Sequence, residues 1–173
     1  MSPPGSSRVR VVVTDTNILI NLIHVGLLDL LAKLPPYSFV VPEEVVNEVS
    51  DSDQAQALQG AISSGVVDVV QLTDPAELAI YAGLLKILGS GEAACLSLAE
   101  CRQWLIASDE KKKFRREALV RLGSGRMLNT PGILALAIRA GILTVEDADH
   151  AKTVLEQHRF IMSFASFRDI LTK

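Results

Sequence analysis

The sequence predicts an α/β fold in which a central, mostly parallel sheet of four to five strands lies between two layers of helices. Short runs rich in β-branched residues alternate with longer helical patterns along the chain, and this order of elements is typical of parallel sheets. The 173 residues suffice for one domain with a substantial core. Because 49% of them are hydrophobic and only 5% aromatic, we expect a core built mainly from Leu, Val, Ile and Ala.

The expected strands are short apolar runs that end in polar or turn residues. Runs such as RVRVVVT and VVDVVQL combine β-branched residues with the length of a buried strand. The strands are predicted at residues 8–14, 37–41, 66–72 and 103–107, with a short fifth strand at 126–128. No apolar run approaches the roughly 20 residues that cross a bilayer, so we expect a cytoplasmic protein without a membrane span.

Helices are expected between the strands, and proline, glycine and capping residues mark their ends. Residues 17–33 predict two short helical segments broken near Gly26, and Pro35-Pro36 ends them because proline cannot continue a helix. Asp74 is a candidate N-cap for the helix that follows it. The other helices are expected after Pro42 and at residues 53–64, 75–88, 92–100, 110–122, 131–140, 145–158 and 164–171.

Charge and cysteine content exclude some classes of protein. The net charge of −3 gives no global positive field, so contact with a nucleic acid would need a local basic patch. Cys95 and Cys101 lie six residues apart, on different sides of one expected helix, which predicts two buried, unpaired thiols. His24, His150 and His158 are scattered and there is no CxxC motif, so we expect no zinc site.

The chain is expected to form a single domain. Residues 1–7 are polar and rich in helix breakers, which predicts a flexible tail. Residues 8–141 carry the α/β pattern, and residues 142–173 add a helical extension that we expect to pack on the same domain. An alternative for the apolar residues of the extension is an exposed face for a partner or a homodimer.

Acidic residues follow the expected strands at several places. Asp15 comes directly after the first strand, Glu48 lies in the helix after the second, Glu92 begins the Ala-rich helix, and Asp109 follows the fourth strand. Ligands of open parallel sheets bind beyond the carboxyl ends of the strands, so we expect these acids at one edge. Clustered carboxylates repel one another unless a cation neutralises them, and oxygen ligands favour Mg²⁺ or Mn²⁺. The pattern therefore predicts a metal-dependent phosphodiesterase.

Each acid also has a purely structural interpretation. Asp15 and Asp109 are suitable helix caps, Glu48 suits a solvated helix position, and Glu92 suits the positive end of a helix dipole. The four together are less easily explained in this way, and their combination favours a site.

Four sequence blocks resemble the PIN-domain ribonucleases, a family that includes many toxins of bacterial and archaeal toxin–antitoxin pairs. The blocks are DTN, VPEEVVNEV, LGSGEAACLSLA and LIASDEKKKFRREA, and the resemblance covers roughly residues 10–140. It implies a PIN-like three-layer α/β/α fold, endoribonuclease activity that uses Mg²⁺ or Mn²⁺, RNA as the substrate, and a small antitoxin protein as a partner.

The resemblance also assigns roles to individual residues. It makes Asp15, Glu48, Glu92 and Asp109 the catalytic, metal-binding acids, with Glu44 as the alternative to Glu48. Glu92 matches the sub-branch with a Gly-Glu-Ala block, whereas many other members have Asp at that position. The supporting residues are Thr16, Asn17, Ser108 and Glu110.

Two further blocks complete the expected site. The helix over residues 110–122 is expected to bury Phe114, Ala118, Leu119 and Leu122 and to expose a basic face. The basic residues are candidates for contact with an RNA backbone: Lys111, Lys112, Arg115 and Arg116. Residues 129–134 resemble the family's Gly-Thr-x-Gly-x-Leu element with Asn129 in place of the first glycine. Thr130 either faces the site or caps the next helix, and we favour the cap.

The acids and the resemblance together favour a metal-dependent endoribonuclease. A catalytically inactive PIN-like module that binds protein or RNA is the alternative. All four expected positions are acidic, which argues against a decayed site, and convergence of these acids in space would discriminate between the two hypotheses.

Overall fold

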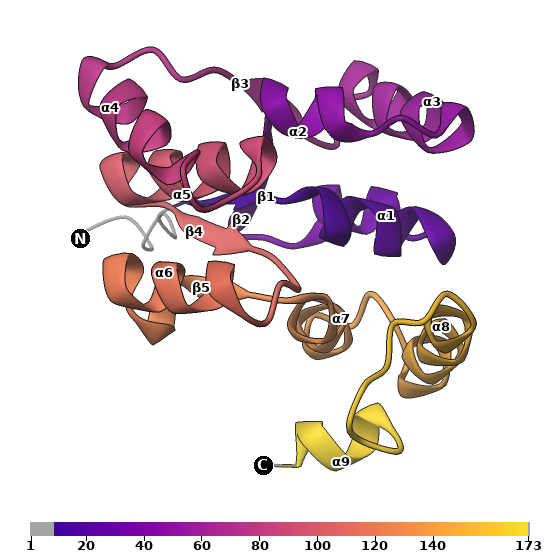
Figure 1. Cartoon of the computed structure of the whole chain (residues 1–173). Coiled ribbons are helices and arrows are strands. Elements are labelled where there is room, and N and C mark those ends of the chain that lie inside the picture. Colours follow the sequence, from indigo (N-terminus) through magenta and orange to yellow (C-terminus); the bar gives the residue numbers. More distant parts are fainter. Residues whose placement is uncertain (1–8, 173) are drawn as a thin grey trace, which may run out of the picture.

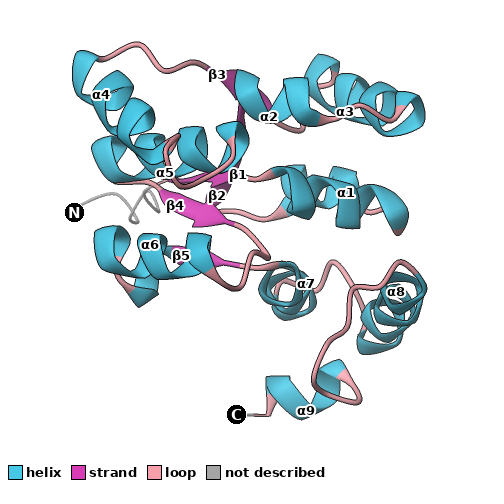
Figure 2. Ribbon diagram, viewed as in Figure 1, coloured by secondary structure: helices cyan, strands magenta, loops and turns pink. Residues whose placement is uncertain are grey.

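The computed structural model describes residues 9–172, and it contains one five-stranded sheet (Figures 1 and 2). The strands are β1 (Arg10–Thr14), β2 (Tyr37–Pro42), β3 (Asp68–Val70), β4 (Leu105–Ala107) and β5 (Met127–Leu128). Their order in the sheet is β3-β2-β1-β4-β5, and every neighbouring pair is parallel. The predicted fold class is confirmed. β3 is shorter than predicted because it lies at the sheet edge and pairs only with Val40–Pro42 of β2.

Helices connect the strands at the positions that the sequence predicts. The α-helices are α1 (Thr16–His24), α2 (Glu43–Glu48), α3 (Ser52–Ser63), α4 (Pro75–Leu84), α5 (Ser90–Arg102), α6 (Lys113–Leu122), α7 (Thr130–Arg139), α8 (Val145–Gln157) and α9 (Phe167–Leu171). Two 3₁₀ helices, η1 (Leu28–Lys33) and η2 (Ser124–Arg126), complete the described elements. Gly26, with φ +67°, separates α1 from η1, and Asp74 caps α4 as predicted.

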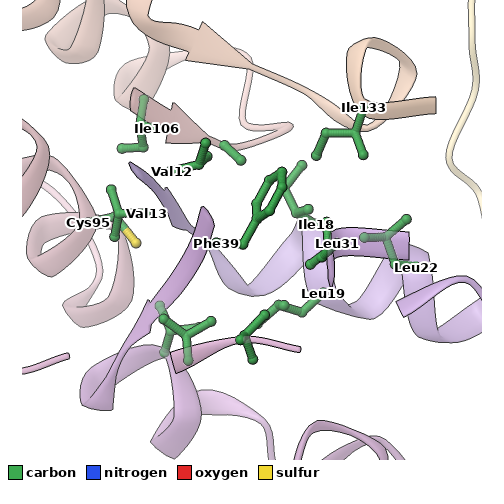
Figure 3. Packing of buried hydrophobic residues seen from close by; sticks show 14 of the residues in the cluster. Val12, Val13, Ile18, Leu19, Leu22, Leu31, Phe39, Cys95, Ile106 and Ile133 are labelled. Carbon is green, nitrogen blue, oxygen red and sulfur yellow. The ribbon is translucent and has the colours of Figure 1, made fainter. Parts of the chain in front are cut away.

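Two helical layers cover the sheet. α5 packs against β1, β2 and β4 and contacts α4 and α6, whereas α1 contacts α3, α7 and α8. Figure 1 shows α4, α5 and α6 on the left of the sheet and α1, α7 and α8 on its right. The core between the layers is aliphatic, as predicted; Figure 3 shows Cys95 near Val13, while Phe39, Ile18 and Ile133 extend the core toward α1 and α7.

The C-terminal helices pack on the rest of the chain. α8 contacts α1 and α7, and α9 contacts α8. The Asp149 carboxylate accepts hydrogen bonds from Ser166 Oγ at 2.6 Å and from the Phe167 N–H at 2.8 Å, and Phe167 is fully buried. None of the helices within residues 9–172 is long and apolar enough to cross a membrane. The expected flexible tail, residues 1–7, lies outside the described residues.

Three expectations about single side chains are wrong. Leu119 does not join the inner face of α6: it is 38% exposed, because the buried residues Phe114, Ala118 and Leu122 recur every four positions and Leu119 is offset from that row. Thr130 does not cap α7, since Asn129 is the cap and accepts the Gly132 N–H at 2.8 Å. Both cysteines are unpaired, but Cys101 is only half-buried.

Candidate acidic site

The candidate site lies where β1 and β4 end side by side. The chain runs outward from β1 to β2 and β3, then returns to the other side of β1 to form β4 and β5. The sheet therefore changes its winding direction between β1 and β4, and this is the crevice in which open α/β sheets bind ligands. Asp15 follows β1 and residues 108–110 follow β4. The Asp15 N–H donates to the Ala107 carbonyl at 3.0 Å and joins the two strand ends.

Asp15 is the most deeply placed acid of the site. It is 3% exposed and caps α1, accepting the Thr16 N–H at 2.8 Å. Its second oxygen accepts Ser108 Oγ at 3.0 Å and Asn17 Nδ2 at 3.2 Å. The helix-cap interpretation of Asp15 is confirmed, and its second oxygen faces polar side chains from two elements.

Burial and the neighbouring carboxylates both oppose the ionisation of Asp15. Burial raises the pKa of Asp15 to about 7, against hydrogen bonds from Thr16 and Ser108 that lower it, and the negative charges of Glu92 and Glu48 raise it further. Burial also raises the pKa of Glu92, and the charges of Glu110 and Glu48 add to that effect. Asp15, Glu48, Glu92 and Glu110, which we call the acid group, thus repel one another and prefer a nearby positive charge.

Glu48, rather than Glu44, is held at the site by hydrogen bonds. It is the last residue of α2, and its carboxylate accepts Thr16 Oγ1 at 2.8 Å and the Gly91 N–H at 2.6 Å. In contrast, Glu44 Oε2 is buried and has no hydrogen-bond partner within the described part of the chain. Sequence spacing left the choice open because both residues follow β2 on nearly the same helix face.

Glu92 reaches the site from the first turn of α5. Its Oε2 accepts the Gly89 N–H at 3.1 Å and closes the start of the helix. This bond uses one side of the carboxylate, so Glu92 combines the capping role that its position suggests with membership of the acid group.

Asp109 points toward α7 instead of joining the acid group directly. Its carboxylate accepts the Thr130 N–H at 2.9 Å, Thr130 Oγ1 at 2.5 Å and Asn21 Nδ2 at 2.9 Å. Burial raises its pKa, and the bonds from Thr130 and Asn21 lower it. Buried Thr130 thus faces the loop after β4, which was the alternative to its capping role. Asn21 was not predicted as a partner; its sequence signal is a polar residue four positions after Asn17, between the apolar residues 18–20 and 22–23 of α1.

Glu110 takes the place nearest to the other acids on this loop. Asn17 Nδ2 donates to Glu110 Oε1 at 3.3 Å, while Asn17 Oδ1 accepts the Asp109 N–H at 3.1 Å. Asn17 therefore bridges the ends of β1 and β4, as a supporting residue of the site would. The Glu110 side chain is exposed and accepts one hydrogen bond, from Asn17, whereas the Asp109 carboxylate accepts three.

The donor chemistry of the acid group suits a hard divalent cation. The donors are carboxylate oxygens, and none of the ion pairs formed by residues 9–172 involves a member of the acid group. In the same residues, no three Asp, Glu, His or Cys side chains are grouped closely enough to hold a metal ion. The residue types fit Mg²⁺ or Mn²⁺. Because the carboxylates are not close enough together to coordinate one ion, they would have to move toward it on binding.

A basic surface and two clefts adjoin the acids. Lys111, Lys112, Arg115 and Arg116 are all exposed, and no ion pair within residues 9–172 engages them. A cleft of about 380 Å³ lies between α6 and residues 160–164, and a second of about 510 Å³ lies between α1 and residues 158–161. Lys111 and Arg115 line the first cleft, and both clefts include Asp109 and Glu110.

Comparison with known proteins identifies the family. The family model for the PIN domain matches residues 11–173, and the chain belongs to that family. The match includes the C-terminal helices, which the sequence blocks did not cover. Among solved structures, VapBC2 from Rickettsia felis, bound to a DNA fragment from its promoter, is similar at 18% identity and a TM-score of 0.48, over 69% of this chain and 98% of that one. No curated protein matches the sequence significantly.

Proposed function

We propose that this chain is an endoribonuclease that hydrolyses RNA phosphodiester bonds with Mg²⁺ or Mn²⁺. PIN domains are generally nucleases, and the chain belongs to that family. The observation that carries the proposal is the environment of Asp15, which is buried beside Glu48 and Glu92 with a pKa raised to about 7. Among residues 9–172, no basic side chain forms an ion pair with it. A buried acid with a perturbed pKa at the switch point of a parallel sheet is typical of a functional site.

The acid group and its neighbours have separate roles in this proposal. Asp15, Glu48, Glu92 and an acid after β4, Asp109 or Glu110, would hold the cation. When bound, such a cation neutralises the carboxylates and activates a water molecule for attack on phosphorus. Ser108 and Asn17 orient Asp15, and Thr16 with the Gly91 N–H orients Glu48.

The exposed basic residues of α6 and the loop before it would bind the RNA backbone. The loop after β4 carries Lys111 and Lys112, and the first turn of α6 carries Arg115 and Arg116. All four therefore follow the same strand end as Asp109 and Glu110. Positive side chains beside an acidic centre keep the phosphate chain in place despite the net charge of −3.

We further propose a toxin role with a small antitoxin partner, which the family resemblance of the sequence blocks motivates. A cytoplasmic location is proposed from the lack of a long apolar run in the sequence, and a homodimer from the apolar residues of the C-terminal extension. Growth arrest on induction of the wild-type chain, relieved by the Asp15→Asn substitution, would support the toxin role. Unimpaired growth at a high level of folded protein would count against it.

The decisive experiment is cleavage of a labelled, structured RNA pool with Mn²⁺, Mg²⁺ or EDTA. We expect cleavage by the wild type that requires metal and is lost in Asp15→Asn. Asp74→Asn is the matched control, because Asp74 is also a helix N-cap but lies on α4, away from the acids, and it should cleave normally.

The alternative is an inactive PIN-like module that binds protein or RNA. Its signature would be a folded wild type that neither cleaves the RNA pool nor binds Mn²⁺ in calorimetry. Mn²⁺ binding that Asp15→Asn abolishes, without cleavage of the pool, would retain the metal site and direct the search to another RNA.

A further inference from the structure

The cleft of about 380 Å³ beside the acids has two walls from distant parts of the sequence. One wall is α6 with the loop before it, and the other is residues 160–164, which follow α8. We call this space the α6 cleft. Because Ser108, Asp109 and Glu110 line one end of it, anything bound in the cleft lies next to the proposed scissile phosphate.

The segment 160–164 is anchored rather than loose. Met162 is buried in the core, and Phe164 packs edge-on against Phe167 with ring centroids 5.0 Å apart. Just before the segment, His158 stacks on His24 of α1 with centroids 3.7 Å apart. The anchors on both sides give the cleft a preformed wall, which reduces the entropy cost of binding.

Cationic and apolar side chains both line the α6 cleft. Lys111 and Arg115 line the cleft and are exposed. Ile161, which is 63% exposed, Leu119, which is 38% exposed, and half-buried Phe160 supply apolar surface in the same cleft. A cleft with cationic and apolar walls matches a ligand with an anionic part joined to a flat apolar part.

We propose that the α6 cleft is a nucleotide subsite that receives one unpaired nucleotide adjoining the scissile phosphate. Lys111 and Arg115 contact its phosphate, and its base packs against Ile161 and Phe160. This inference rests on the proposed function, since the acids at the end of the cleft define where cleavage occurs. A cleft of this volume lies at the small end of ligand sites, which suits one nucleotide better than a duplex.

Charge complementarity favours a nucleotide over a segment of a partner protein. The cations and the apolar wall face the same narrow space, and the exposed base of an unpaired nucleotide can use both at once. In this proposal, residues 160–164 contact one base of the RNA. That contact helps to select which phosphodiester bond lies at the acids.

The test measures binding without cleavage. A labelled eight-nucleotide RNA is titrated into Asp15→Asn in EDTA, alongside copies in which successive single nucleotides are abasic, and fluorescence anisotropy gives each Kd. We expect one abasic position to weaken binding about five- to tenfold. Ile161→Ala in the same background should weaken the intact RNA similarly and should remove the sensitivity to that position, because both changes delete one contact.

Val120→Ala is the matched control for Ile161→Ala. Val120 is an exposed aliphatic residue of α6, 81% exposed, that does not line the cleft, so its truncation should leave every Kd unchanged. Both side chains are exposed, so both variants should melt within about 2 °C of the wild type. Lys111→Gln and Arg115→Gln should each reduce the slope of log K against log salt by about 0.7, whereas Lys86→Gln should not.

The outcomes separate this proposal from the proposed function. If no abasic position affects binding, or if Ile161→Ala behaves as Val120→Ala does, the subsite is wrong even when the wild type cleaves RNA. Coupling between Ile161 and one base position without any cleavage by the wild type would support the subsite and overturn the nuclease. Unchanged RNA binding together with weakened binding of a partner protein by Ile161→Ala would assign the cleft to protein docking and overturn the subsite.

Discussion

The carboxylate of Glu48 occupies the space where a side chain on Gly91 would begin. The Gly91 N–H donates to Glu48 Oε1 at 2.6 Å, and a Cβ placed on Gly91 would lie 2.5 Å from Glu48 Oε2 and 2.8 Å from its carboxyl carbon. Glycine therefore permits the first turn of α5 to approach the end of α2, and the position of an acid depends on the absence of a side chain on a neighbouring helix.

We predict that Gly91→Ala lowers metal-dependent cleavage by on the order of 10–100-fold, the range typical of changes in the residues that support metal ligands. The added methyl group displaces the Glu48 carboxylate, while the better helix propensity of alanine, worth about 1 kcal/mol, offsets part of the packing cost. Steady-state cleavage rates and thermal melts measure both effects.

Gly60→Ala is the control for this substitution. Gly60 lies in α3, and no atom lies within 4 Å of a Cβ placed there, so this variant should gain stability and cleave normally. Wild-type cleavage by Gly91→Ala would show that the position of Glu48 is not important for the activity.

The fold and most of the acidic positions could be predicted because they depend on local pattern. The β-branched run before Asp15 and the acids after later strands are visible in the sequence, and parallel strands bring their ends to one edge. The contact of Gly91 with Glu48 and the turn of Asp109 toward Thr130 depend on how distant elements pack. Side-chain direction in such contacts has no periodic signature, so the sequence could not distinguish them.

We predict that loss of the ion pair between Glu77 and Arg102 destabilises the fold away from the site. Glu77 is 3% exposed and accepts Arg102 Nε at 2.6 Å as well as the backbone N–H groups of Thr73 and Asp74. Arg102→Gln leaves this buried acid without its cation, which should cost about 2–3 kcal/mol in urea unfolding. Arg121→Gln breaks two partly exposed surface pairs, with Glu100 and with Glu117, and should cost less than about 1 kcal/mol.

The Arg102 hydrogen bond also sets a pH dependence. It lowers the pKa of Glu77 to about 2, from 4.5, so the stabilisation is present above pH 4.5 and is lost as the pH falls toward 2. The stability of Arg102→Gln should decline less over this window. Parallel acid-unfolding curves for the two proteins would count against the assignment.

Asp15 should produce the opposite pH dependence. Burial raises its pKa from 3.8 to about 7, so the ionised form is the costly one in the folded chain. The contribution of neutral Asp15 to the free energy of unfolding is fully present below pH 3.8, and it is lost as the pH rises from 3.8 through 7. We predict that, in EDTA, the stability of Asp15→Asn relative to the wild type rises by about 2–4 kcal/mol between pH 4 and pH 8.

Asparagine retains the capping role of residue 15, but its amide group would face the donor Asn17 Nδ2. That cost does not depend on pH, so the pH dependence of the stability difference isolates the charge. Saturating Mn²⁺ should raise the melting temperature of the wild type at pH 8 and leave Asp15→Asn unchanged. Thermal melts at pH 4, 6 and 8, with and without Mn²⁺, provide the test; a stability difference that does not change with pH would contradict the assigned effect of burial.

The last prediction concerns which acid after β4 serves the site. Asp109 accepts three hydrogen bonds from Thr130 and Asn21. In contrast, Glu110 is an exposed member of the acid group and accepts a hydrogen bond from Asn17. We predict that Glu110→Gln lowers cleavage at least tenfold with little change in melting temperature. Asp109→Asn should instead lower the free energy of unfolding by about 1–3 kcal/mol, because its new amide group would face the donor Asn21.

Measurement of Mn²⁺ affinity by calorimetry completes the comparison between these two acids. Glu110→Gln should weaken Mn²⁺ binding directly, because it removes a ligand. Asp109→Asn should weaken Mn²⁺ binding only indirectly, by displacing the loop after β4. The reverse pattern, with a stable but inactive Asp109→Asn and an active Glu110→Gln, would make Asp109 the fourth ligand. Its bonds to Thr130 and Asn21 would then orient a metal-binding carboxylate, in the same way that Ser108 and Asn17 orient Asp15.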